Sequence, residues 1–100
     1  MRQASRALGS AGVPGATTYL VEHYWPGITA EAFHAAAERV RTTARAMARG
    51  GTPIRYLHSI MVPADEAAFC IFDAASMELI EQLYARAGVR FDRIVAALEV

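Results

Sequence analysis

The chain has 100 residues, with ten basic side chains, all arginine, balancing ten acidic ones. This length is typical of one domain, and a net charge of zero argues against nucleic acid as the main partner, because phosphate binding needs a basic surplus. A single cysteine excludes an intrachain disulfide and fits a reducing, cytoplasmic setting. No apolar run is long enough to span a membrane. We therefore expect a cytoplasmic protein with neither a nucleic-acid nor a membrane partner.

Residues 1–16 differ in character from the rest of the chain. They contain small residues and two arginines but no apolar periodicity and no apolar core of a secretory signal. We predict that they form a flexible N-terminal tail and that residues 17–100 form the folded domain.

The first half of the domain predicts a strand followed by a helix. Residues 17–25 are rich in β-branched and aromatic side chains and end at the turn signal Pro26-Gly27, which indicates a strand. Thr29 can then cap a helix, in which apolar residues recur at spacings of three and four until Gly50-Gly51.

The second half predicts two strands, a helix and a last strand. Residues 54–62 and 67–73 are apolar runs joined by a polar link of hairpin length. Ser76 can cap a second helix that ends at Gly88, and residues 91–100 alternate as a strand does.

This βαββαβ order predicts an α+β ferredoxin-like sandwich. Right-handed crossovers place both helices on one face of a four-stranded antiparallel sheet with strand order 4-1-3-2. By strand alternation, the residues expected on the helix side are Val21, Leu57, Phe69, Ile71 and Val95. Those expected on the uncovered face are Leu20, Tyr56, Ile60, Phe72, Ile94 and Leu98.

An uncovered sheet face with that many apolar side chains implies a partner. Alanine supplies much of the apolar content, so the core of one subunit is thin, which also favours association. We expect a homodimer that packs sheet on sheet as a dimeric α/β barrel and encloses a cavity.

A polar set is expected to line this cavity. Glu22 and Tyr24 are two residues apart, as are Tyr56 and His58, so each pair shares a face of its strand, and we expect Cys70 on the same side. Cys70, Glu22 and His58 are competent ligands for nickel or another transition metal. Tyr24, Tyr56 and Phe72 would contact a small ligand.

The same groups allow acid–base chemistry. A Glu22 carboxylate desolvated between two sheets would be a proton carrier near neutrality, with His58 and Tyr24 as further catalytic groups. Simpler structural roles compete with both interpretations, because a lone strand cysteine is usually a small buried hydrophobe. By parity, His23 points away from the side of Glu22, and His34 lies on the polar side of the first helix.

Arg41, Arg45 and Arg49 form a row at i, i+4 spacing on the first helix. Such a row is usually a solvated helix face. An anion-binding ridge is the alternative.

Four stretches of the chain, YLVEHYWPGIT, RYLHS, AFCIFDA and YARAGVRFDRIV, occur in that order. Over residues 18–99 the chain thereby resembles a family of small bacterial proteins, catalogued as a domain of unknown function, whose described example is a dimeric, ferredoxin-like, nickel-binding protein. Nickel-binding members tend to carry histidines near the end of strand one and around the second helix and its turn. The corresponding positions here are Glu22 and His23 in the strand and Tyr84 and Val89 in the helix and turn, and Cys70 matches the strand-three cysteine of the family.

Three functional hypotheses follow. The resemblance implies a metal-binding or metal-responsive protein. The polar set also allows a small-molecule enzyme, such as an isomerase, a cyclase or a cofactor-free oxygenase, and an accessory protein that binds a ligand without chemistry is the third.

Overall fold

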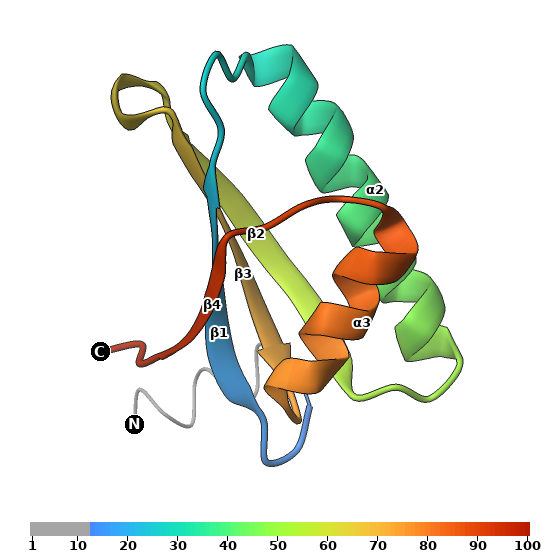
Figure 1. The fold of residues 1–100 in the computed structure, drawn as a ribbon. Coiled ribbons are helices and arrows are strands. Elements are labelled where there is room, and N and C mark those ends of the chain that lie inside the picture. Colours follow the sequence, from blue (N-terminus) through green and yellow to red (C-terminus); the bar gives the residue numbers. More distant parts are fainter. Residues whose placement is uncertain (1–12) are drawn as a thin grey trace.

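A four-stranded antiparallel sheet and two helices form the two layers of the molecule (Figure 1). The structure is a computed structural model that describes residues 13–100. The strand order is β2-β3-β1-β4, which is the expected order 4-1-3-2 read from the other edge, so the ferredoxin-like fold is confirmed. The elements are β1 (Thr17–Tyr24), α2 (Ala30–Arg49), β2 (Ile54–Val62), the 3₁₀ turn η1 (Pro63–Asp65), β3 (Ala67–Ala74), α3 (Met77–Ala87) and β4 (Arg93–Ala97).

The first strand begins at Thr17. Most of the tail expected over residues 1–16 lies outside the described residues, so the tail remains a prediction. Between residues 13 and 100, neither helix is long and apolar enough to cross a lipid bilayer.

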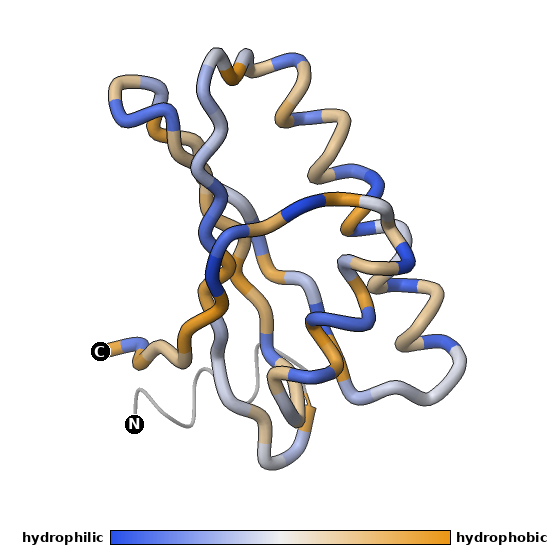
Figure 2. The backbone as a smooth tube through the Cα atoms, in the orientation of Figure 1, coloured by the Kyte–Doolittle hydropathy of each residue, from blue (hydrophilic) through white to orange (hydrophobic). Residues whose placement is uncertain are grey.

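Helix α2 begins as its sequence predicts. The Oγ1 atom of Thr29 accepts a hydrogen bond from the backbone N–H of Ala32 at 3.0 Å, and Glu31 lies in the first turn, where a negative charge favours the helix dipole. The face turned to the sheet is apolar, as the alternating colours along the helix show in Figure 2. The buried residues of this face are Phe33, Ala36, Val40, Ala44 and Met47.

Helix α3 ends at Gly88, whose φ of 69° lies in the left-handed region that glycine tolerates best. Ser76 occupies the N-cap position, but its hydroxyl makes no capping hydrogen bond. The guanidinium of Arg39 on α2 donates to the carbonyl oxygens of Ala87 and Gly88, at 3.3 and 2.7 Å respectively, so it joins the two helices. This contact fixes the position of the turn after α3.

The last strand is shorter than the range 91–100 expected from its sequence. Its pairing with β1 ends at Thr18 opposite Ala97, because β1 itself begins only one residue earlier. Leu98 has no strand beside it and is 88% exposed. The segment before β4 is held differently, by a bond from the backbone N–H of Asp92 to the carbonyl oxygen of Glu22 at 2.8 Å.

The register of the sheet corrects the assignment of faces. In β1 the residues facing the helices are Tyr19, Val21 and His23, as strand alternation predicts for Val21. Val21 lies opposite both Cys70 and Ile94, so the helix-facing set includes these residues. The expected helix-side positions Phe69, Ile71 and Val95 lie instead on the open face with Leu20 and Ile60, whereas Phe72, Ile94 and Tyr56 lie on the helix side.

A bulge in β2 explains why residues two apart in this strand face opposite ways. Tyr56 pairs with Phe72, yet His58 pairs with Ile71, so Leu57 is an extra residue in the ladder. Phe72 is fully buried beneath the helices, and its neighbour Ile71 faces the other side. The irregularity therefore sends Tyr56 to the core and His58 to the open face.

Candidate functional site

The expected polar set does not share one face of the sheet. Glu22, Tyr24 and His58 lie on the open face, whereas Tyr56 and Cys70 lie beneath the helices. Phe72, expected to contact a ligand, is 0% exposed and part of the core. The prediction that all of these residues line one cavity on the open face is therefore wrong for a single subunit.

Glu22 has a partner within its own subunit. Its carboxylate accepts two hydrogen bonds from the guanidinium of Arg93 on the neighbouring strand, at 3.2 and 2.8 Å. This contact raises the pKa of Arg93. Glu22 is thus a paired carboxylate in a cross-strand ion pair.

The three candidate catalytic residues are not adjacent. β3 lies between β1, which carries Glu22, and β2, which carries His58. Two strand spacings amount to about 10 Å, too far for direct proton transfer between these side chains. Tyr24 is 60% exposed at the end of β1. Within one subunit these residues do not form an acid–base site.

The three candidate metal ligands are separated as well. Cys70 lies opposite Val21, the residue before Glu22, so the thiol and this carboxylate point to opposite faces. Between residues 13 and 100, no three His, Cys, Asp or Glu side chains come together in a group that could hold a metal ion. A metal site of Cys70, Glu22 and His58 is not formed in the subunit.

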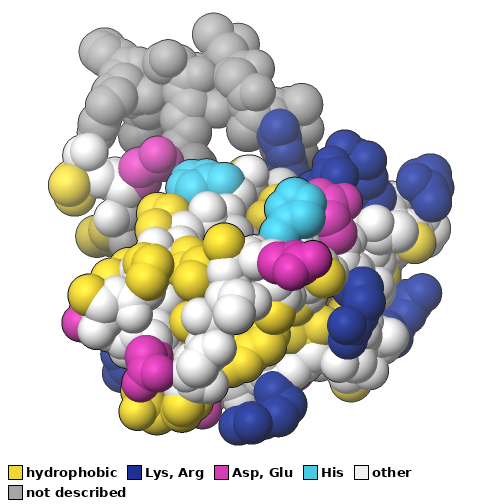
Figure 3. Space-filling model, turned by 90° about the horizontal axis from the view of Figure 1, so that it is seen from above, with side chains coloured by type: hydrophobic (Ala, Val, Ile, Leu, Met, Phe, Trp, Pro, Cys, Tyr) yellow, Lys and Arg dark blue, Asp and Glu magenta, His cyan; other side chains and the backbone are white. Residues whose placement is uncertain are grey.

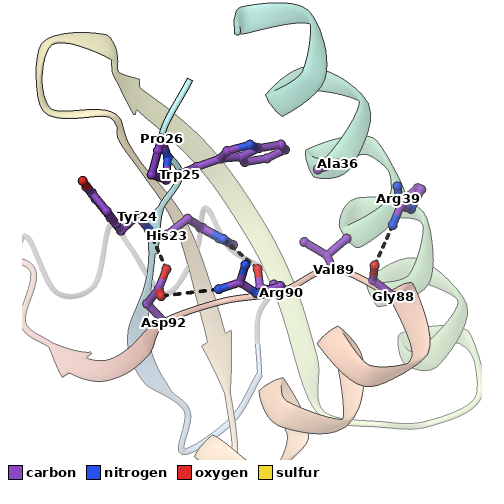
Figure 4. Close-up of a pocket in the computed structure, with 10 residues that line it drawn as sticks. All are labelled: His23, Tyr24, Trp25, Pro26, Ala36, Arg39, Gly88, Val89, Arg90 and Asp92. Carbon is purple, nitrogen blue, oxygen red and sulfur yellow. Dashed lines mark hydrogen bonds and ion pairs between the residues drawn. The ribbon is translucent and has the colours of Figure 1, made fainter. Parts of the chain in front are cut away.

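The structure instead places a cleft of about 320 Å³ between the end of β1, helix α2 and the turn after α3 (Figure 4). Its walls are largely apolar, with Trp25 lying across the space toward α2 and Val89 opposite it. We call this space the His23 cleft. Its lining residues are His23, Tyr24, Trp25, Pro26, Ala36, Arg39, Gly88, Val89, Arg90 and Asp92.

His23 is the buried titratable group of this cleft. Its Nδ1 lies 3.0 Å from the carbonyl oxygen of Arg90, and because a carbonyl can only accept, Nδ1 carries the proton. Burial lowers the pKa of the imidazole, although the Arg90 carbonyl and the Asp92 carboxylate partly oppose this effect. The ring is therefore neutral at physiological pH, with its lone pair on Nε2.

Nε2 of His23 faces the core rather than open space. The hydroxyl of Tyr84 lies 3.5 Å from it, and the same hydroxyl also interacts with the Cys70 thiol. Two further hydrogen bonds extend this row of side chains. Ser59 Oγ donates to Cys70 Sγ at 3.1 Å, and the hydroxyls of Tyr56 and Ser59 share a hydrogen bond of 2.6 Å. Burial raises the pKa values of Cys70, Tyr56 and Tyr84, so all three stay protonated. We call this line of five side chains the buried polar chain.

Charged groups surround the mouth of the cleft. Asp92 is held in place because its Oδ2 accepts from the backbone N–H of Tyr24 at 2.6 Å. The side chain of Arg90 is 88% exposed and has only a 3.9 Å contact with Asp92. The guanidinium of Arg39 already donates a hydrogen bond to the carbonyl oxygen of Gly88, at the end of α3. Arg90 is therefore the rim cation best able to reach a ligand.

Sequence reasoning placed His23 away from the expected site, and its parity was right. The error lay in expecting Cys70 and Tyr56 on the same face of the sheet as Glu22 and His58. The signal that could have found the cleft is the position of His23, Tyr24 and Trp25 directly before a Pro-Gly turn. Side chains at the end of a strand lie next to the loop that follows.

The fold and the cleft define a class: a small ferredoxin-like protein with a partly apolar cleft between its sheet and its helices. The sequence model of one family, described as nickel responsive protein SCO4226-like, matches residues 19–96. The chain belongs to this family, as the resemblance in its sequence implied.

A solved structure supports the fold independently. The crystal structure of SCO4226 from Streptomyces coelicolor A3(2) superimposes with a TM-score of 0.70 at 20% sequence identity, covering 83% of this chain and 99% of that one. At this identity the likeness shows the fold alone. No curated protein sequence matches the chain.

The family name raises the question of whether this chain could hold nickel. The cleft offers one imidazole, and both of its nitrogens face partners, the Arg90 carbonyl and the Tyr84 hydroxyl. Nickel bound by protein side chains needs several nitrogen, sulfur or oxygen ligands. The described residues of one subunit therefore do not fit a complete nickel site.

Proposed function

We propose that this protein is a ligand-binding member of the nickel-responsive family and that its ligand is a small organic molecule bound in the His23 cleft. The observation that carries the proposal is the combination of apolar walls with a neutral imidazole whose tautomer is fixed. Sites for small molecules are commonly concave and mostly apolar, with a few polar groups that orient the ligand.

The charges at the rim favour an anionic group on the ligand. Trp25, Ala36 and Val89 suit a flat apolar body, and the exposed guanidinium of Arg90 suits a carboxylate. Asp92 points to the same mouth, but its carboxylate accepts a hydrogen bond from the Tyr24 N–H, whereas the exposed Arg90 has only the long contact with Asp92. We therefore propose a small aromatic or branched carboxylate as the ligand class.

The only tryptophan of the chain lines this cleft, so its fluorescence reports on binding directly. The experiment titrates the protein with benzoate and with neutral benzamide and follows the emission of Trp25. We expect benzoate to bind more tightly than benzamide, and Arg90→Gln to remove the difference. Arg86→Gln is the matched control, because Arg86 is an exposed arginine on α3 outside the cleft. No saturable response to either probe, or equal effects of the two variants, would reject the proposal.

Metal binding is the second candidate, favoured by the family and by the orientation of His23. A ring whose Nδ1–H donates to a carbonyl is the usual arrangement of a metal-ligating histidine. Here Nε2 would have to exchange the Tyr84 hydroxyl for the metal, and the other ligands would come from outside the subunit. Calorimetry with nickel on the native protein, His23→Gln and Cys70→Ser tests this. Binding that persists unchanged in His23→Gln would exclude the cleft as the metal site.

We also propose that the protein is a homodimer. In the described part of the chain no helix covers the face of the sheet opposite α2 and α3 (Figure 1). This face carries Leu20, Ile60, Phe69, Ile71 and Val95. A second copy packed on it would remove an extended apolar surface from water. In such a dimer the His23 cleft of each subunit would remain on the outer, helix side.

A further inference from the structure

The hairpin between β2 and β3 contacts the loop that carries Trp25, and one residue makes both hydrogen bonds. The carbonyl oxygen of Glu66, directly after the turn η1, accepts from the backbone N–H of Trp25 at 2.8 Å. Its carboxylate atom Oε2 accepts from the backbone N–H of Gly27, also at 2.8 Å. In Figure 1 the hairpin lies beside the loop between β1 and α2. We call these two hydrogen bonds the Glu66 latch.

The latch holds a tight turn. The Ile28 N–H donates to the carbonyl oxygen of Trp25 at 3.0 Å, which closes a four-residue turn with Pro26 second and Gly27 third. The φ of Gly27 is 75°, the value that a type II turn requires at its third residue. The backbone at Trp25 is therefore fixed both within the turn and by the hairpin, and the indole extends from there across the His23 cleft (Figure 4).

Glu66 has a backbone conformation that favours glycine. Its φ is 49°, and no other residue except glycine has a positive φ in the described part of the chain. Glycine and asparagine adopt this left-handed conformation more readily than glutamate does. The bond to the Trp25 N–H uses only the backbone of Glu66, so it does not explain the choice of side chain. The contact of the carboxylate with Gly27 does explain it, because unfavourable backbone conformations persist where the residue has a task.

This task depends on the reach of the side chain rather than on its charge. Between residues 13 and 100, the carboxylate of Glu66 forms no ion pair. Figure 3, seen from above, shows most basic side chains gathered on the side of the molecule where the helices lie, whereas the hairpin lies on the opposite side in Figure 1. Glu66 supplies an acceptor atom at the end of a side chain long enough to join the hairpin to the loop.

We infer that Glu66 is a positioning residue for the His23 cleft, because it holds the turn from which Trp25 forms one wall. This inference rests on the proposed function of the cleft and adds the residue that sets the shape of the site. Glu66 does not itself line the cleft, so it acts through the turn. Without the latch, only the fraction of molecules with the indole in place would bind a ligand, and the apparent affinity would fall by that fraction.

Two variants that differ by one methylene group separate reach from charge. Glu66→Gln keeps an acceptor oxygen at the same reach, whereas Glu66→Asn is too short to contact Gly27 but suits the left-handed backbone. Acrylamide quenching of Trp25, the only tryptophan of the chain, measures how firmly the indole is held without ligand. We expect Glu66→Asn to raise the quenching constant about twofold or more and to change the melting temperature by no more than about 4 °C. Glu66→Gln should resemble the native protein.

Benzoate titration of the same variants tests whether the latch serves the cleft. We expect the apparent affinity to fall by about fivefold in Glu66→Asn, the loss typical of one hydrogen bond, and to stay within about twofold of the native value in Glu66→Gln. Asp65→Asn is the matched control, because it removes an exposed carboxylate from the adjacent turn η1. It should change neither the quenching nor the affinity.

Three results would overturn the inference. One is equal quenching of Trp25 in the native protein and in Glu66→Asn, which would show that the turn holds the indole without the carboxylate. Another is equal losses in Glu66→Asn and Glu66→Gln, which would assign the effect to charge. The third is a loosened indole with unchanged benzoate affinity, which would make the latch purely structural. If the native protein binds neither benzoate nor benzamide, the proposed function fails, and the quenching comparison alone decides whether Glu66 positions Trp25.

Discussion

The hydroxyl of Tyr84 lies 3.5 Å from Nε2 of His23, between helix α3 and strand β1. The two rings also pack at a tilt, with centroids 5.6 Å apart. This contact leaves the one imidazole of the cleft without a free lone pair. It ties the chemistry of the cleft to the buried polar chain behind it.

The Tyr84 contact predicts how to strengthen a metal site. Tyr84→His would place a second imidazole beside His23, and two nitrogen ligands bind nickel better than one. We expect the affinity for nickel to rise by about tenfold or more, measured by calorimetry at pH 7.5. The double variant His23→Gln with Tyr84→His should lose the gain. An unchanged affinity in Tyr84→His would show that the cleft cannot close around a metal.

The buried His23 predicts a pH dependence of stability. Burial lowers the pKa of His23, so the unfolded chain takes up a proton near the ordinary value of about 6.5, whereas the folded chain resists protonation. The free energy of unfolding should therefore be independent of His23 protonation above about pH 6.5. It should decrease as the pH drops from there toward the lowered pKa of His23.

Urea denaturation between pH 8 and pH 5 measures this effect. His23→Gln should flatten the profile, whereas His58→Gln, which changes an exposed histidine, should not. Equal slopes in the native protein and in His23→Gln would contradict the prediction.

The thiol of Cys70 should be inert in the folded protein. It is 1% exposed, and burial raises its pKa, so little thiolate forms at neutral pH. We expect a disulfide reagent such as DTNB to react at least about tenfold more slowly with native protein than with protein in urea. Rapid labelling under native conditions would mean that the core beside Tyr84 opens readily.

Glu22→Gln tests whether this carboxylate has a chemical role. Its ion pair with Arg93 is partly exposed, and such pairs contribute little to stability. We expect the melting temperature to change by no more than about 4 °C and ligand binding in the His23 cleft to be unaffected. Arg93→Gln should give a similar small change. Loss of function in Glu22→Gln at unchanged stability would return the site to the open face.

The homodimer predicts a sensitive position at the centre of the open face. Ile71→Arg would place a charge in the proposed interface, whereas Ala35→Arg places the same charge on an exposed position of α2. Light scattering at micromolar concentration should find a dimer for the native protein and for Ala35→Arg, and a monomer for Ile71→Arg. A native monomer that is fully folded would rule out the assembly.

The sequence by itself determined the elements and their order. Thr29, the apolar helical spacing and Gly88 mark helix ends where the structure has them, because caps and periodicity are local properties of the chain. The βαββαβ order then predicted the strand order, since short right-handed connections leave few alternatives. The resemblance to the nickel-responsive family was likewise present in the residues.

Only the tertiary structure decided which side chains meet. Alternation shows that Glu22 and Val21 point opposite ways, but the pairing of Val21 with Cys70 is a matter of register, which depends on contacts between distant strands. The bulge at Leu57 then separates Tyr56 from His58, although they are two residues apart. For these reasons the structure places the cleft around His23, under the helices, and separates the residues that the sequence had suggested would meet on the open face of the sheet.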